Sequence, residues 1–151
     1  IAFMVYTIGD HKSILDRLDQ GRFNQFARQA LERDLGEGKA QMVQNIETRG
    51  TGKTWEHAWG PNGRAASTPG RDDTGQMKGA VEGPETVSGL PNGASGFLGW
   101  PEGSPEYFRH QENGFYNVLI GVDVTEMRAL RDAADETTTE VIQSVRNYAR
   151  K

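Results

Sequence analysis

The stretch "RFNQFARQALERDLGEGKAQMVQNIE", residues 22–47, decides the fold that the sequence predicts. Its apolar side chains recur at steps of mainly three and four, which places them on one face of an amphipathic helix. They are Phe23, Phe26, Ala27, Ala30, Leu31, Leu35, Met42, Val43 and Ile46. Gly36 and Gly38 weaken the middle of this helix by about 1 kcal/mol each against alanine where they are exposed, so a bend is compatible with this sequence.

The residues on the N-terminal side of this helix predict a strand. "IAFMVYTI", residues 1–8, is rich in strand-forming side chains and lacks the basic flank and cleavage site of a signal peptide. Asp10 and Ser13 are candidate helix N-caps, and a shorter helix near residues 13–19 would end at Gly21. The chain is therefore expected to enter the long helix from a strand.

A second strand and a second long helix are predicted near the C-terminus. "FYNVLIGVDV" predicts a buried strand over residues 115–122, and Asp123 or Thr125 can cap a helix over residues 126–150. The stripe of apolar or small residues on that helix is Met127, Leu130, Ala134, Thr138, Val141, Val145 and Tyr148. Such a stripe packs against a sheet or another helix.

The middle of the chain, residues 49–105, has a different composition. It holds 13 of the 19 glycines, all six prolines and all three tryptophans. This predicts mostly loop and turn, with short strands near residues 76–81 and 96–100. The aromatic side chains predicted to contact a partner are Trp55, Trp59, Phe97 and Trp100; the alternative is that they fold back onto the domain's own core.

Together these segments predict a single α+β domain over residues 1–151. Two long helices would pack on a small, mostly antiparallel sheet, with residues 49–105 as a loop-rich insert within the domain. The net charge of −4, from 17 basic and 21 acidic residues, gives no basic footprint for general nucleic-acid binding. With no cysteine, disulfides and thiolate metal sites are excluded. No apolar run approaches the roughly 18 residues of a membrane span.

One segment looks like a nucleotide-binding loop but lacks the spacing and the context of that motif. "ETRGTGKTWEHAWG", residues 47–60, contains Gly-Lys-Thr, which ends at Thr54 and is the last part of a phosphate-binding loop motif. The first glycine of that motif would have to stand at position 47, which is Glu47. The segment follows a predicted helix instead of a strand, and Gly60-Pro61 prevents a long helix after it. Gly50 and Gly52 are better explained as helix-stop and turn residues.

The sequence gives no positive support for catalysis, a metal site or a cofactor. His11, His57 and His110 lie far apart and lack the spacing that places two ligands on one helical face. No serine lies in a Gly-x-Ser-x-Gly elbow, and the adjacent carboxylates Asp72 and Asp73 have no matched acid/base partner. We therefore expect a protein that is not an enzyme.

Two short motifs stand between the predicted helices. The first is Asp73-Thr74-Gly75-Gln76-Met77. The second begins with Gly99-Trp100 and continues through Tyr107-Phe108 to Glu112-Asn113-Gly114-Phe115. Side chains of Asp73 and Thr74 can fix a turn, Gly75 can supply a positive φ, and Met77 would then enter the core. Glu112 to Gly114 would end a short helix with a left-handed cap.

In order and spacing, these motifs resemble the tail-completion or head-to-tail joining proteins of long-tailed bacteriophages, of the lambda minor tail protein Z type. The resemblance covers about residues 14–150, with methionine in place of leucine in the first motif and a longer insert. It implies a structural virion protein assembled in the bacterial cytoplasm. It also implies a hexameric ring of this chain, adjoining neck and tail-tube proteins as partners, and DNA passing through the lumen without tight binding.

Two other classes of function remain open from the residues. One is a small soluble hydrolase that uses His57 or His110 with Asp72 or Asp73. The other is a non-viral adaptor domain.

Overall fold

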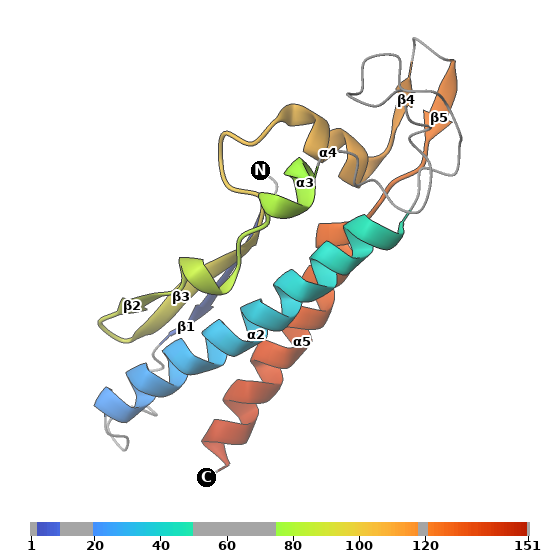
Figure 1. Cartoon of the computed structure of the whole chain (residues 1–151). Helices are drawn as coiled ribbons and strands as arrows, with labels where there is room; N and C mark the ends of the chain where they lie inside the picture. Colours follow the sequence, from blue (N-terminus) through green and yellow to red (C-terminus); the bar gives the residue numbers. More distant parts are fainter. Residues whose placement is uncertain (1–2, 10–19, 50–74, 118–120, 151) are drawn as a thin grey trace.

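The predicted α+β architecture is confirmed by the computed structural model, which describes residues 3–9, 20–49, 75–117 and 121–150 (Figure 1). Two long helices run beside a small antiparallel sheet, and a short hairpin lies at one end. In chain order the elements are β1 Phe3–Ile8, α2 Gln20–Thr48, α3 Gln76–Gly79, the 3-10 helix η1 Pro84–Thr86, β2 Ser88–Leu90, β3 Gly93–Gly99, α4 Glu106–Asn113, β4 Phe115–Asn117, β5 Val122–Val124 and α5 Ala129–Ala149.

The larger sheet has three strands in the order β1-β3-β2, and both pairings are antiparallel. β1 pairs with β3 along its whole length, from Phe3 opposite Gly99 to Ile8 opposite Ala94. The central strand thus comes from the glycine-rich middle of the chain, where the sequence predicted a strand only over residues 96–100. The described half of that insert, residues 75–105, belongs to the body of the domain.

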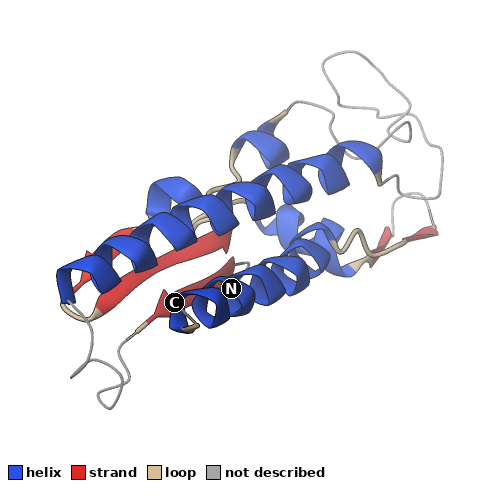
Figure 2. Ribbon diagram, turned by 90° about the horizontal axis from the view of Figure 1, so that it is seen from below, coloured by secondary structure: helices blue, strands red, loops and turns tan. Residues whose placement is uncertain are grey.

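The two long helices lie side by side along one face of the sheet (Figure 2). Their close approach depends on Gly38, because an added Cβ there would collide with Thr137 Oγ1 and lie 2.9 Å from Leu98 Cδ2. Gly36 has no such role, since the nearest atom to an added Cβ is 3.9 Å away. α2 runs through both glycines as one helix.

The core lies between the helices and the sheet. α2 contributes the apolar stripe that the sequence predicted, and the sheet contributes side chains from β1 and β3. Its largest fully buried apolar side chains are Leu31, Leu35, Met42, Val81, Leu98, Trp100, Phe108, Met127 and Ile46. Burial of these side chains from both layers is the main stabilising term of the fold.

Two strand predictions are wrong. Residues 76–81 do not form a strand: α3 occupies Gln76–Gly79, started by Gly75 in the left-handed region. The predicted single strand over residues 115–122 is divided into β4 and β5, which pair antiparallel as a hairpin. Gly121, with φ 64°, stands at the start of the second strand and supplies a conformation that a continuous strand would not use.

The predicted start of the last helix is also corrected. α5 begins at Ala129 instead of Glu126, and its N-cap is Arg128, with no capping side chain of its own. Asp123 lies in β5 and does not cap it. The predicted stripe is correct in part. Leu130, Ala134 and Val141 are buried on α5 and Met127 is buried just before it, whereas Thr138 and Val145 are exposed. The shorter helix predicted near residues 13–19 lies outside the described residues.

Candidate functional site

Trp100 joins the two sequence motifs in space. Its side chain is 1% exposed, and its indole N–H donates to the carbonyl oxygen of Met77 at 2.8 Å. Its ring packs against Phe108 of α4, with ring centroids 5.4 Å apart. The residue therefore holds α3, from the first motif, against α4, from the second.

The first motif forms a short helix whose geometry depends on glycine. Gly75 has φ 77° and ψ −2°, a left-handed conformation that glycine adopts without steric cost. Its carbonyl oxygen accepts the N–H of Gly79 at 2.9 Å, closing the turn. Met77 is 4% exposed, so the prediction that it enters the core is confirmed.

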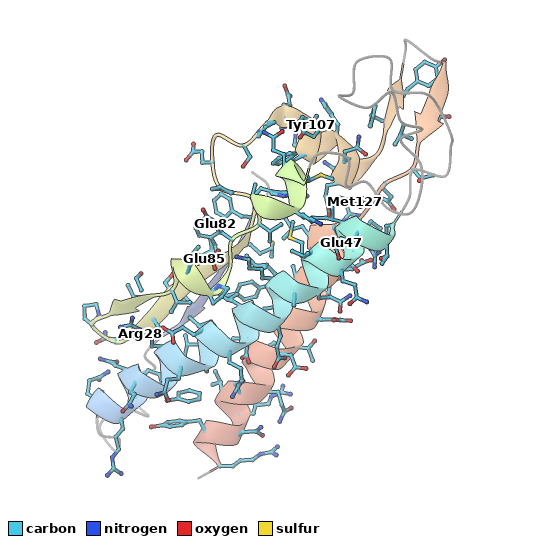
Figure 3. All side chains as sticks on the ribbon, in the orientation of Figure 1. Arg28, Glu47, Glu82, Glu85, Tyr107 and Met127 are labelled. Atoms are coloured by element: carbon cyan, nitrogen blue, oxygen red, sulfur yellow. The ribbon has the colours of Figure 1, made fainter. Side chains whose placement is uncertain are left out.

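Two side chains hold α3 from opposite sides (Figure 3). The Tyr107 hydroxyl of α4 donates to Gln76 Oε1 at 2.9 Å. On the other side, Lys78 Nζ donates to Glu47 Oε1 at 3.0 Å near the end of α2. The first motif is thus tied to both a short helix and a long one.

Glu112 of the second motif caps α5 from a different helix. Its side chain is buried, and its two carboxylate oxygens accept the N–H groups of Leu130 at 3.1 Å and Arg131 at 2.9 Å. The backbone carbonyl of Glu112 also accepts the N–H of Arg128 at 3.2 Å. A carboxylate that satisfies free N–H groups at the positive end of a helix is stabilising.

Gly114 ends α4 in a conformation that differs from the expected left-handed cap. Its φ is 77°, as expected, but its ψ is 158°. An added Cβ would lie 2.9 Å from both Glu126 N and Val124 O, so the chain that follows β5 passes directly over this residue. Glycine is therefore required here by both its backbone angle and its crowding.

Arg49 completes the junction from the end of α2. Its Nη1 donates to the carbonyl oxygens of Met127 at 3.0 Å and Arg128 at 3.1 Å, and to Asp132 Oδ2 at 2.6 Å. Burial acts to raise the pKa of Asp132, but hydrogen bonds from Arg49 and Arg128, together with their charge, outweigh it, so that this pKa lies below its ordinary value. The start of α5 is thus held by α4 on one side and α2 on the other.

A groove of about 440 Å³ lies elsewhere, between α2 and α5, and its walls are acidic. Glu37, Glu136 and Glu140 line it together with the buried carboxylate of Asp34. Asp34 is fully engaged, because Oδ2 accepts the Ser144 hydroxyl at 2.8 Å and Oδ1 accepts Arg33 Nε at 2.9 Å. Among the described residues no group of three histidine, cysteine or acidic side chains could hold a metal ion.

The four aromatic residues predicted to contact a partner have different positions. Trp55 and Trp59 lie outside the described residues. The prediction is wrong for Trp100, because its ring fills the core and its N–H is already bonded. Phe97 is half-buried, with its ring centroid 5.2 Å from that of Phe3.

The residues of the hydrolase alternative are not brought together in the described part of the chain. His57, Asp72 and Asp73 lie outside it, as does Thr74 of the first motif. His110 is exposed on α4, and its ring lies 6.0 Å from that of Phe115.

Two contacts of the junction, those of Glu112 and Arg49, could not be predicted from local sequence patterns. Glu112 was predicted to end a helix, but its partners lie 18 and 19 residues away, and no local pattern names them. The role of Arg49 likewise depends on a meeting with Met127 and Asp132, 78 and 83 residues along the chain. Only the packing of α2, α4 and α5 creates these sites.

Comparison with family models, curated proteins and solved structures found no match to this chain. Of the helices described, none combines the length and apolar character that crossing a bilayer would need.

Proposed function

We propose that this chain is a structural virion protein of a tailed bacteriophage. It would form a ring at the neck or at the top of the tail, in tail completion or head-to-tail joining. Six copies would surround a channel through which DNA passes, and the virion, assembled in the bacterial cytoplasm, would be its location.

The observation that carries the proposal is the meeting of the two motifs around Trp100. The residues on which the resemblance rests have joint structural roles: Gly75 starts α3, Met77 enters the core, and Glu112 caps α5. These contacts tie the middle of the chain to both long helices. Such ties are expected to make the subunit rigid, as a ring-forming protein requires.

A rigid subunit suits a ring in which each copy presents one surface to the next. Such head-to-tail contacts close when the rotation between copies divides a full turn. The adjoining neck and tail-tube proteins would contact the two faces of this ring. With a net charge of −4, the chain would let DNA pass through the lumen without binding it tightly.

Electron microscopy of particles purified from the source, with this chain labelled by a C-terminal tag, tests the proposal. The expected result is a ring of tagged density at the head–tail junction, and counting its subunits gives the symmetry. Light scattering of the purified chain gives its oligomeric state before assembly. Absence of the tag from all particles would contradict the neck function, and assays for hydrolysis would then test the enzyme alternative.

A further inference from the structure

The three-stranded sheet has an outer face without charge. The strands read FMVYTI, SGL and GASGFLG, and none of these residues carries a charge at neutral pH. Register places Phe3, Val5 and Phe97 on the face away from α2 and α5, and Val5 is 59% exposed. In a chain with 25% charged residues, an uncharged surface of this kind is typical of a contact site.

The free edge of β1 also offers unpaired backbone groups. On the far side of β3, Gly99 exchanges backbone hydrogen bonds with Glu82, and the N–H of Phe97 donates to Thr86 Oγ1 at 2.8 Å. Successive residues of a strand direct their N–H and C=O groups to opposite sides. The β3 residues that bond β1 are therefore Leu98, Gly96 and Ala94.

The orientation within β1 follows from this pairing. Its residues opposite Gly99, Phe97 and Ser95 are Phe3, Val5 and Thr7. The N–H and C=O groups of these three residues therefore point away from β3. Among the described residues no strand pairs with that edge.

The two edges of this sheet differ in how well they are protected. β2 has three residues and lies between Pro84 and Pro91, and short strands near proline are poor templates for pairing. β1 has six residues, with no proline and no charge. β1 is thus the edge that can accept another strand.

The position of α5 limits which strands can pair with the β1 edge. α2 packs mainly over β3, and the Tyr6 hydroxyl donates to Ala134 O at 2.8 Å, which places α5 over β1. Packed helices lie about 8–10 Å apart, while strands lie about 4.8 Å apart. α5 therefore covers the inner face of the sheet beside the β1 edge, and Ile142 and Val145 are exposed on this helix.

The position of α5 over β1 disfavours the pairing of β1 with β1 of a second copy. Antiparallel pairing about a two-fold axis puts both helix layers on the same side of the joined sheet. The two α5 helices would then crowd each other above the two paired β1 strands. A strand without a helix above it does not meet this obstacle.

The β4–β5 hairpin is a strand pair of that kind. It projects beyond the start of α5, away from the larger sheet (Figure 1). In the described residues each of its strands pairs only with the other, and an isolated two-stranded hairpin is marginally stable in water. Tyr116 of β4 is 58% exposed.

We propose that the β1 edge of one copy accepts the β4 strand of a neighbouring copy, which joins the hairpin to the sheet. The proposal rests on the ring-forming function proposed above and supplies its head-to-tail contact. β4 is preferred to β5 because its residues are uncharged, like the β1 edge, whereas β5 carries Asp123. The donor and acceptor surfaces differ, so the contact is heterologous and can close a ring.

Cross-linking with single-cysteine variants tests the contact, because the natural chain has no cysteine. Val5→Cys and Tyr116→Cys chains are mixed and treated with a short bis-maleimide. The expected product joins the two variants, at about tenfold or more over the control mixture of Leu90→Cys with Tyr116→Cys, because docking raises the local thiol concentration. Equal yields in the two mixtures, or a dominant Val5→Cys homodimer, would overturn the proposal.

Sedimentation of the full chain gives a second test. Val5→Lys places a charge on the β1 edge, and Leu90→Lys places the same charge on the β2 edge, where the side chain is 39% exposed. Val5→Lys is expected to abolish self-association, while Leu90→Lys retains it and both variants keep the thermal unfolding midpoint. Loss of association in both or in neither would overturn the proposal.

These results are separable from those on the neck function. A specific cross-link in a chain that no particle contains would retain the contact and remove the proposed location. A tagged ring in particles, with no cross-link in solution or in the particle, would retain the function and remove the contact.

Discussion

The two faces of the three-stranded sheet have similar compositions and opposite surroundings. On the inner face, Tyr6, Ile8 and Leu98 are buried against α2 and α5. On the outer face, Val5 is exposed, and Phe3 and Phe97 form an aromatic pair that no described helix covers. Neither face carries a charged side chain from the strands.

The difference shows that apolar composition does not by itself identify the core. A one-sided antiparallel sheet normally alternates apolar inward and polar outward residues. Here the alternation is weak, because residues that face outward are apolar or small as well. The inner face supplies part of the core, whereas the outer face and the β1 edge are the surfaces of the proposed contact between copies.

The largest effect should come from a charge in the core beside the inner face. Met77→Asp buries an unpaired carboxylate under Trp100, and we expect it to lower the free energy of unfolding by several kcal/mol. Chemical denaturation followed by tryptophan fluorescence measures the change. A loss below about 0.5 kcal/mol would show that residue 77 is accessible to water and that α3 is misplaced.

Adjacent residues of β3 compare the faces directly. Leu98→Ala removes a fully buried side chain and should cost about 2–5 kcal/mol. Phe97→Ala should cost less, because the side chain is half-buried and the lost aromatic pair adds about 0.5–1.5 kcal/mol to the lost burial. Denaturant unfolding of the isolated chain measures both. Equal costs at the two positions would mean that the outer face is covered within the monomer and that the two faces do not differ in burial.

The long helices were predictable because their periodicity is a local property. The prediction over residues 22–47 matches α2 within two residues at its start and one at its end, and α5 starts three residues later and ends one residue earlier than predicted. The later start has a physical cause. Within residues 125–128, Met127 and Arg128 form hydrogen bonds with Arg49 and with the backbone of α4. No capping residue near Asp123 indicates these long-range contacts.

Sheet pairing and the candidate site were predictable only in part. The two motifs contain Met77 and Glu112 but do not indicate their partners, because those contacts join segments 18 to 23 residues apart through packing. Trp100 was assigned to a partner because a tryptophan in a Gly/Pro-rich segment can serve either role. Its burial depends on α3 and α4 closing over it, which composition does not encode.

Removal of the cap on α5 should lower the free energy of unfolding by an intermediate amount, because this helix packs on the inner face of the sheet. Glu112→Gln keeps the shape of the side chain but loses its charge and one acceptor, and we expect a cost of about 1–2 kcal/mol. Glu106→Gln, at the exposed start of the same helix, is the matched control and should change stability by less than about 0.5 kcal/mol. Thermal unfolding of both variants measures the difference, and equal values would remove Glu112 as the cap.

The smallest expected effect is on the acid dependence of unfolding, through Asp132 near the start of α5. Asp132 has a folded pKa below its ordinary value of 3.8, so its contribution to stability is complete above that value and is lost as pH falls through the folded pKa. Asp132→Asn should therefore make unfolding less sensitive to pH below about 4. Exposed Asp135→Asn is the control and should retain the natural chain's acid dependence. Because Asp132 is about one-third exposed, solvent weakens its pairing with Arg49, and we expect a shallow slope. Identical acid slopes in the natural chain and in Asp132→Asn would show that the pair with Arg49 contributes nothing to holding α5 over the sheet.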